Sequence, residues 1–597
     1  MLLTLAIFLP LVGAAVVLAL PKENLKVIRW TSLAFAVATF APIVALTMGY
    51  ADGGDASVAE VFDARIAEVV DEVPGGVRAD VKRLLEDPKA FHPGIQEFVP
   101  ADPEEPTEAE QRTLGARATL EKIREAGAYD QWHDAWELTV ARAAAIAEDV
   151  KYVEHADWIP LFNIRYFLGV DGLSLPLIFL TGLLWILCFA YSFRIDKAVK
   201  GYFALFLLLE TGLIGVFCAL DFFLFYVFWE VVLLPMYFLI GIWGGPRRIY
   251  AAIKFFIYTF VGSVLMLVAM LALYWHQGFD TFNLLTLSAM SDGFGLTFQM
   301  WIFWALFIGF AIKVPVFPFH TWLPDAHVQA PTAVSVVLAG VLLKMGGYGF
   351  FRFLYTLTPE AMRVDWVIVC IGVLGVINIV YGAMCAMAQR DFKSLVAYSS
   401  VSHMGYVLLG MAALTQLGVQ GAVLQMFNHG VSSAMLFLLV GVIYDRAHHR
   451  DLNNFGGIGL QMPYYTGFAI IGFFASLGLP GLNGFIAEFS SLAGSFNSQT
   501  FFADYSLVFG LPRWLVYCAL PGMVLTAGYI LWAMQRVYLG QPKKEEYKTF
   551  KDLDGREVFV LAPLAFLCIL LGVYPSIIID YMDPTLETVR LFVTGGR

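Results

Sequence analysis

The chain has 597 residues, of which 59% are hydrophobic and only 15% charged, and its mean hydropathy is +0.70. This composition excludes an ordinary soluble globular protein and indicates one embedded in a membrane. No nucleic-acid partner is expected of a chain whose formal net charge is −11.

The first apolar run, Met1 to Leu20, has no positive charge before it, whereas Lys22, Lys26 and Arg29 follow it. That order favours an uncleaved span with its N-terminus outside over a secretory signal peptide. Because lipid leaves backbone groups unpaired, the spans must be helices of about 20 apolar residues. We predict an all-α integral membrane protein with about fourteen transmembrane helices, at residues 2–20, 29–49, 173–193, 202–220, 222–243, 252–275, 299–319, 331–353, 365–387, 395–414, 421–444, 463–493, 515–536 and 558–579.

A polar insertion at residues 51–157 separates the second and third spans. It holds 25 acidic and 11 basic residues, whereas the rest of the chain holds 24 and 27. Helix-like patterns at 108–126 and 129–153 follow a proline-rich middle. Two interpretations stay open: a solvated helical hairpin or partly disordered flap, or a segment that docks against a neighbouring subunit. The prolines are Pro88, Pro93, Pro100, Pro103 and Pro106.

Basic residues cluster in the loops after odd-numbered spans, whereas the loops after even-numbered spans, apart from the insertion, are nearly bare of them. Lys393, which is assigned to the loop after span nine, and Lys543 and Lys544, which follow span thirteen, are examples. By the positive-inside rule, these loops face the cytoplasm or mitochondrial matrix, and both termini face the opposite, periplasmic side.

Several spans contain ionisable residues, which cost about 2.5–3.5 kcal/mol each at a helix centre and therefore suggest function. Glu230 and Lys344 stand in the middle of their spans. Lys313, in the seventh span, is followed at once by Pro315 and Pro318, which should break the helix. Broken helices are tolerated within membranes only where the backbone is buried in protein or lines a cavity.

A second break is predicted at Gly478–Gly484, with Glu488 one helical turn beyond it. The two broken spans are numbers seven and twelve, and an offset of five spans inverts the second copy in the membrane. We therefore predict two inverted five-helix repeats, spans 4–8 and 9–13, each with one broken helix.

Histidines titrate near neutrality and suit a proton relay. His320, His403 and His429 are candidates, and His327, Lys254 and Glu210 are further ones. Two other interpretations remain: satisfied core histidines, and buried ion pairs in which Glu230, Lys313, Lys344 and Glu488 hold helices together. Lys254 could also reach the surface from its place near a span end.

No redox or nucleotide site is evident in this chain. The six cysteines lie in apolar runs without metal-ligand spacing, so we expect no iron–sulfur cluster and no metal. Glycine-rich nucleotide-binding motifs are also missing from the sequence.

Four segments, in order and spacing, closely resemble the M-type family of antiporter-like subunits of respiratory complex I (NADH-quinone oxidoreductase), the counterpart of mitochondrial subunit 4. They are FLGVDGLSLPLI, FYVFWEVVLLPMYFLIGIWG, KVPVFPFHTWLPDAHVQAPT and RDFKSLVAYSSVSHMGY. Related L-type, N-type and antiporter subunits usually carry lysine where this chain has Glu488. The insertion at 51–157 departs from the family pattern.

The resemblance implies a proton-translocating membrane subunit in which Glu230 modulates the proton affinity of Lys313. Lys344 would pass the proton onward through His320, His403 and His429, and Glu488 would release it outward. It also implies L-type and N-type neighbours on either side, NAD, FMN, iron–sulfur clusters and quinone in partner subunits, and a bacterial or mitochondrial inner membrane. The alternatives are a subunit of a multi-subunit cation/proton antiporter, a membrane-bound hydrogenase arm, or a non-pumping scaffold.

The expected division of the chain is 1–50 (two spans), 51–157 (outer insertion), 158–201 (third span), 202–353 (first repeat), 354–537 (second repeat) and 538–597 (last span and C-terminus).

Overall fold

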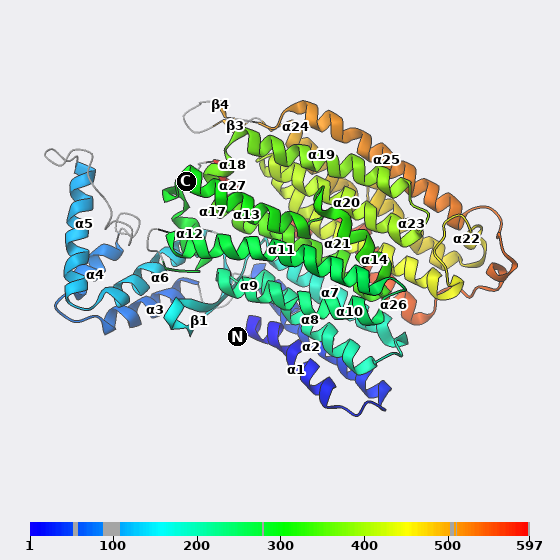
Figure 1. Ribbon diagram of the computed structural model, residues 1–597, viewed down its shortest axis with the longest axis horizontal. Helices are drawn as coiled ribbons and strands as arrows, with labels where there is room; N and C mark the ends of the chain where they lie inside the picture. Colours follow the sequence, from blue (N-terminus) through cyan, green and yellow to red (C-terminus); the bar gives the residue numbers. More distant parts are fainter. Residues whose placement is uncertain are drawn as a thin grey trace.

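A bundle of long apolar helices makes up most of the protein (Figure 1). The computed structural model describes residues 1–51, 58–86, 108–147, 149–276, 280–498, 500–501, 507–508 and 510–594. Within these residues, thirteen helices are long and apolar enough to cross a membrane, which confirms the predicted helical, multi-pass fold. They are α1 (Leu2–Ala19), α2 (Leu25–Ala51), α7 (Leu175–Tyr191), α8 (Val199–Cys218), α9 (Phe222–Val231) with α10 (Leu233–Trp243), α11 (Arg248–Tyr274), α13 (Leu296–Lys313), α15 to α17 (Thr332–Leu357), α19 (Asp365–Met387), α20 (Phe392–Ala412), α21 (Gln416–Ala447), α25 (Arg513–Tyr538) and α26 (Gly555–Val573).

Two spans are interrupted at the breaks that the sequence predicts. α13 stops at Lys313, and a short helical turn leads into α14 (Trp322–Gln329). The twelfth predicted span forms two pieces, α23 (Pro463–Leu477) and α24 (Asn483–Phe496). Gly478 and Gly481 lie between them with φ of +80° and +90°, a left-handed conformation that glycine adopts without a steric penalty.

The insertion is helical in its described part, with α3 (Val58–Glu72), α4 (Arg78–Leu85), α5 (Glu108–Glu125) and α6 (Tyr129–Ala147). Its proline-rich middle lies outside the described residues. The predicted helix at 129–153 is too long, because residues from Lys151 onward form a β-hairpin that the all-α prediction missed. β1 (Lys151–Ile159) pairs antiparallel with β2 (Ile164–Val170), with His155 opposite Phe167. Tyrosine, valine, tryptophan and isoleucine in these segments favour strands.

Both termini lie at the same end of the bundle as the insertion, and the loop between α25 and α26 lies at the opposite end (Figure 1). The C-terminal helix α27 (Ser576–Thr594) follows α26. Short elements elsewhere are α12 (Leu284–Ala289), α18 (Pro359–Met362), α22 (Ile458–Gln461), β3 (Thr500–Phe501) and β4 (Leu507–Val508).

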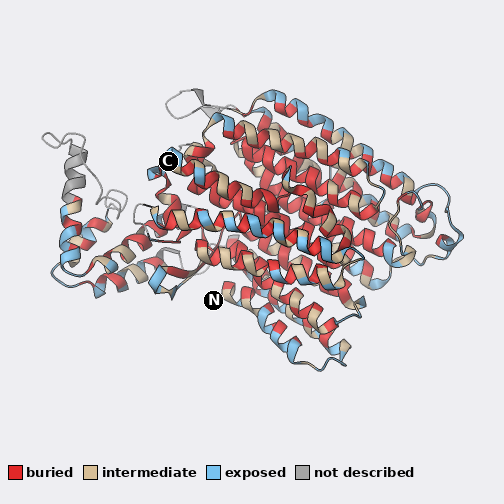
Figure 2. Cartoon of the chain, in the orientation of Figure 1, coloured by how far each residue is buried: buried red, intermediate tan, exposed pale blue. Residues whose placement is uncertain are grey.

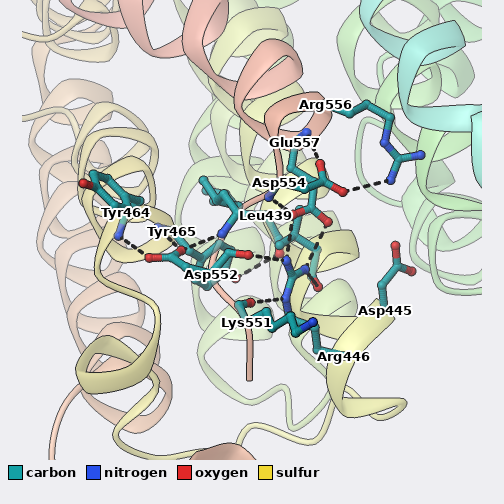
Figure 3. A network of polar contacts seen from close by, with 12 residues as sticks. Leu439, Asp445, Arg446, Tyr464, Tyr465, Lys551, Asp552, Asp554, Arg556 and Glu557 are labelled. Carbon is teal, nitrogen blue, oxygen red and sulfur yellow. Dashed lines mark hydrogen bonds and ion pairs between the residues drawn. The ribbon is translucent and has the colours of Figure 1, made fainter. Parts of the chain in front are cut away.

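Ion pairs fasten the helices at both ends. At the end with the basic loops, Arg446 of α21 pairs with Glu557 of α26 at 2.7 Å, and Asp552 accepts hydrogen bonds from the backbone N–H groups of Tyr464 and Tyr465 (Figure 3). At the other end, the buried guanidinium of Arg352 donates to the buried carboxylate of Asp171. The α15 to α17 stretch and α21, which carry Lys344 and His429, are therefore each held near one end.

The deepest part of the bundle is formed by α15 to α17, α20 and α21 (Figure 2). The membrane-crossing stretches of α15 to α17 and of α21 are buried along their whole length. Lys344, His403 and His429 lie on these helices, so most of the predicted polar residues are in the interior and not at the lipid surface.

Candidate functional site

Lys313 ends α13 and points into an aromatic pocket. Its side chain is 1% exposed, and Nζ lies 5.0 Å from the centroid of the Trp229 ring and 5.7 Å from that of Phe255. A cation over an aromatic face is attracted by the ring. Among the described residues, Nζ has no hydrogen-bond partner.

Glu230 lies next to Trp229 at the end of α9, where the helix is interrupted before α10 begins. Its carboxylate is close enough to Lys313 to interact electrostatically, yet its Oε1 is buried without a hydrogen-bond partner in the described part of the chain. No direct hydrogen bond joins the Lys313 Nζ to this carboxylate among the described residues, which does not favour the interpretation that the two residues merely hold helices together.

The break after Lys313 is stabilised by a side chain that sequence reasoning missed. Asn378 of α19 accepts a hydrogen bond from the N–H of Phe317 at 2.8 Å, and its Nδ2 donates to the carbonyl of Pro315 at 3.2 Å. An asparagine in the middle of an apolar span was the available signal, because a buried amide needs partners.

Lys344 contacts His429 on a neighbouring helix. The Lys344 Nζ lies 2.8 Å from His429 Nδ1 and also donates to the carbonyl of Ala339. That carbonyl belongs to a π-helical turn at Leu338–Leu342, a local distortion that is frequent at functional sites. A Cβ at Gly430 would lie 2.9 Å from the carbonyl oxygen of Gly340, so glycine allows the two helices to approach this closely.

His403 and Glu488 continue this polar row. The His403 Nδ1 lies 2.9 Å from Glu488 Oε1, and its Nε2 lies 3.0 Å from Ser476 Oγ. The rings of His403 and His429 are 5.6 Å apart, centroid to centroid. All four residues, Lys344, His429, His403 and Glu488, are buried. The sequence placed them on four different spans, and the structure brings them into one line.

Contacts just after the glycine-rich break position α24, the helix that carries Glu488, beside His429. Asn428, beside His429, donates to the carbonyl of Asn483 at 2.7 Å, and Asn483 donates back to the carbonyl of Asn428 at 3.2 Å. This reciprocal pair fixes the start of α24 against α21.

Lys393 is a buried charge that the sequence analysis assigned to a loop. It is 4% exposed, and its Nζ donates to the carbonyl of Ala330 at 2.5 Å. The signal was its position in the first turn of α20, just after the capping residue Asp391. A cation there opposes the helix dipole, so it needs another reason to be present.

His327 lies within electrostatic range of both Lys393 and Lys344. It is fully buried and stacks on Phe437 at 4.5 Å, and neither ring nitrogen has a hydrogen-bond partner among the described residues. It is thus a buried titratable group near both lysines.

A cavity of about 370 Å³ with both polar and apolar walls borders Lys393 at the end of the bundle with the basic loops. Its walls include the exposed Arg194 together with Asp445 and Arg450. Solvent at this end can therefore approach the buried lysine.

The remaining predicted residues stand apart from the row. Lys254 pairs with Asp325 at 2.8 Å, and both side chains are partly exposed, in line with the surface interpretation. His320 is 2% exposed and meets Tyr381 edge-on at 5.3 Å. Glu210 is fully buried, and neither of its carboxylate oxygens has a hydrogen-bond partner among the described residues.

Comparison with known proteins places these features in context. The family described as "NADH:quinone oxidoreductase/Mrp antiporter, TM" matches residues 219–510. The NADH-quinone oxidoreductase subunit M of Rhodobacter capsulatus is 47% identical over 449 residues, 73% of this chain and 84% of that protein. Its counterpart in Rickettsia conorii is 42% identical over 73% of this chain and 85% of that protein. A chain of the respiratory complex I from Thermus thermophilus with bound NADH has a TM-score of 0.73 and 26% identity, covering 99% of this chain and 100% of that one.

Proposed function

Because the chain belongs to the NADH-quinone oxidoreductase subunit M family, we propose that it conducts protons across the membrane while other subunits transfer electrons from NADH to quinone. The observation that carries this proposal is the buried row Lys344, His429, His403 and Glu488. Each member can accept and release a proton, and direct contacts or adjacent rings connect them.

The proton enters at the cavity beside Lys393 and reaches Lys344 by way of His327. From Lys344 it passes to His429, His403 and Glu488. The unpartnered nitrogens of His327 and His429 support water in the gaps, because buried polar groups are almost always hydrogen-bonded to protein or ordered water.

Lys313 controls this row, and Glu230 controls Lys313. A nearby carboxylate strengthens the hold of a lysine on its proton, and removal from water weakens it, so a small change in their separation switches Lys313 between charge states. Lys313 packs close to the Lys344 helix, since a Cβ at Gly346 would lie 3.0 Å from the Cβ of Lys313. Charge on Lys313 therefore repels a proton from Lys344. His320, Lys254 and Glu210 remain candidates on the periphery of this pathway.

The assembly and orientation follow from the same proposal. NAD, FMN, iron–sulfur clusters and quinone are bound by partner subunits, and L-type and N-type subunits flank this one in a bacterial or mitochondrial inner membrane. Both termini face the periplasmic side, supported by their position opposite the basic loops. Residues 202–353 and 354–537 form the two inverted repeats. The antiporter and hydrogenase alternatives are less favoured, because the curated relatives cited above are M subunits of NADH-quinone oxidoreductase.

Glu488→Gln tests the proposed exit from this row. It keeps the shape of the side chain but removes the proton-accepting carboxylate, so we expect NADH:quinone turnover per assembled complex to fall about tenfold, equivalent to about 1.4 kcal/mol. Glu23→Gln, at an exposed position, is the matched control. Wild-type turnover and proton pumping in an assembled Glu488→Gln complex would contradict the proposal.

A further inference from the structure

One carboxylate of the insertion is buried in the body of the protein. Glu137 of α6 is 0% exposed, although the described part of the insertion is rich in exposed acids. Burying a charge is costly unless it is paired and hydrogen-bonded, so the partners of Glu137 indicate what the insertion is built to hold.

Three side chains meet the Glu137 carboxylate. Thr281 Oγ1 donates at 2.8 Å, Asn163 Nδ2 donates at 2.8 Å, and Arg165 Nη2 lies at 3.4 Å. Burial raises the pKa of Glu137, but the charges of Arg165 and His133 and the two hydrogen bonds outweigh burial and hold it below its usual value. Glu137 is therefore an anion tied to the β-hairpin and to the strip 280–286.

The strip 280–286 is bound in turn to the start of α9. The N–H of Phe222 donates to the carbonyl of Phe282 at 2.7 Å, and the N–H of Leu284 donates to the carbonyl of Leu220 at 2.9 Å. Asp221, which caps α9, also accepts a hydrogen bond from the Arg165 N–H at 3.2 Å. Glu137 is thus connected to α9, the helix that carries Glu230, in two ways. One connection runs through Thr281 and the strip 280–286, and the other runs through Arg165 and Asp221.

The same strip leads into α13, the helix that ends in Lys313. α6 packs against α12 at this end of the bundle (Figure 1), and Thr286 donates to the Glu137 carbonyl at 3.4 Å. In the first turn of α13, Gln299 donates to the carbonyls of Ser291 and Phe294 at 3.0 and 2.9 Å. The connection from Glu137 to α13 is therefore hydrogen-bonded throughout.

We propose that the insertion is an outer clamp, in which Glu137 is a positioning residue that sets the spacing of the Glu230 and Lys313 helices. This inference rests on the proposed function and deepens it. α9 and α13 are joined at their outer ends by the strip that Glu137 holds, so a change at Glu137 alters the geometry of the Glu230 and Lys313 pair without touching either.

The test measures quinone-reduction kinetics per assembled complex in membrane vesicles. Glu137→Gln keeps the volume and removes the charge, and we expect kcat to fall about tenfold with KM for quinone unchanged, because a displacement of about 1 Å costs up to about 100-fold. Thr281→Val removes one hydrogen bond to Glu137 and should lower kcat less than Glu137→Gln does. Thr281→Ser keeps the hydroxyl and should therefore have the wild-type kcat. Glu125→Gln, an exposed acid of the insertion, is the control.

A double-mutant cycle separates this clamp from a merely stabilising contact. In a Glu230→Gln background, Glu137→Gln should lower kcat no further, since both act on the same pair. Loss of assembled complex with unchanged kcat in Glu137→Gln and Thr281→Val would overturn the clamp, and so would a full additional loss in the double mutant. If Glu230→Gln alone had wild-type kcat, the proposed function would fail instead.

Discussion

Replacing Lys313 with alanine is expected to lower NADH:quinone turnover and proton pumping by about 100-fold, the lower part of the range for a positioned proton-transfer group. The Lys313 ammonium lies over Trp229 and near Glu230, and in the proposed pathway its charge controls Lys344. Without this ammonium, Glu230 has no lysine whose proton affinity it can modulate. The proton on Lys344 is then no longer controlled by a neighbouring charge. Both rates are measured in vesicles that contain equal amounts of assembled complex.

Two variants define what the Lys313 result means. Lys26→Ala removes an exposed lysine and should leave both rates unchanged. Lys313→Arg keeps the positive charge, but a guanidinium does not release its proton, so this variant should be nearly as impaired as the alanine variant. Intact pumping in Lys313→Ala and Glu230→Ala complexes would show that the chain is a scaffold and not a pathway.

Replacing Lys344 with alanine should have an equally large effect, about 100-fold on turnover. In the proposed pathway, Lys344 is the junction between the entry from Lys393 and the row of His429, His403 and Glu488. His429→Leu should give a similar loss because it removes the next acceptor.

The proposed pathway has Lys344 and His429 acting in series, so the double variant should be no worse than the more impaired single variant. Lys197→Ala, an exposed lysine whose Nζ reaches a backbone carbonyl, serves as the control for loss of a positive charge. Losses that multiply in the double variant would show that the two residues act separately.

The sequence predicted the helical fold and the positions of both breaks, because those features are local. Pro315 and Pro318 lie close together, Gly478 begins a glycine-rich run, and a charge in an apolar run is visible without a structure. The spans themselves could be recognised from apolar length alone.

Features that depend on distant partners could not be predicted. The pairing of His403 with Glu488 joins residues 85 positions apart, and no local pattern encodes it. Lys393 was assigned to a loop because charge spacing along the chain does not reveal burial. The π-helical turn before Lys344 and the burial of Glu137 arise from packing between elements, and the β-hairpin was hidden by its overlap with a helix-like pattern.

The most direct test of the proton path is an experimental structure of the assembled complex that resolves ordered water. We predict water molecules hydrogen-bonded to the nitrogens of His327 and to Lys313 Nζ, linking Lys393, Lys344 and Glu488 into one chain of contacts. A dry gap filled by apolar side chains between Lys393 and Lys344, or between His429 and His403, would contradict it.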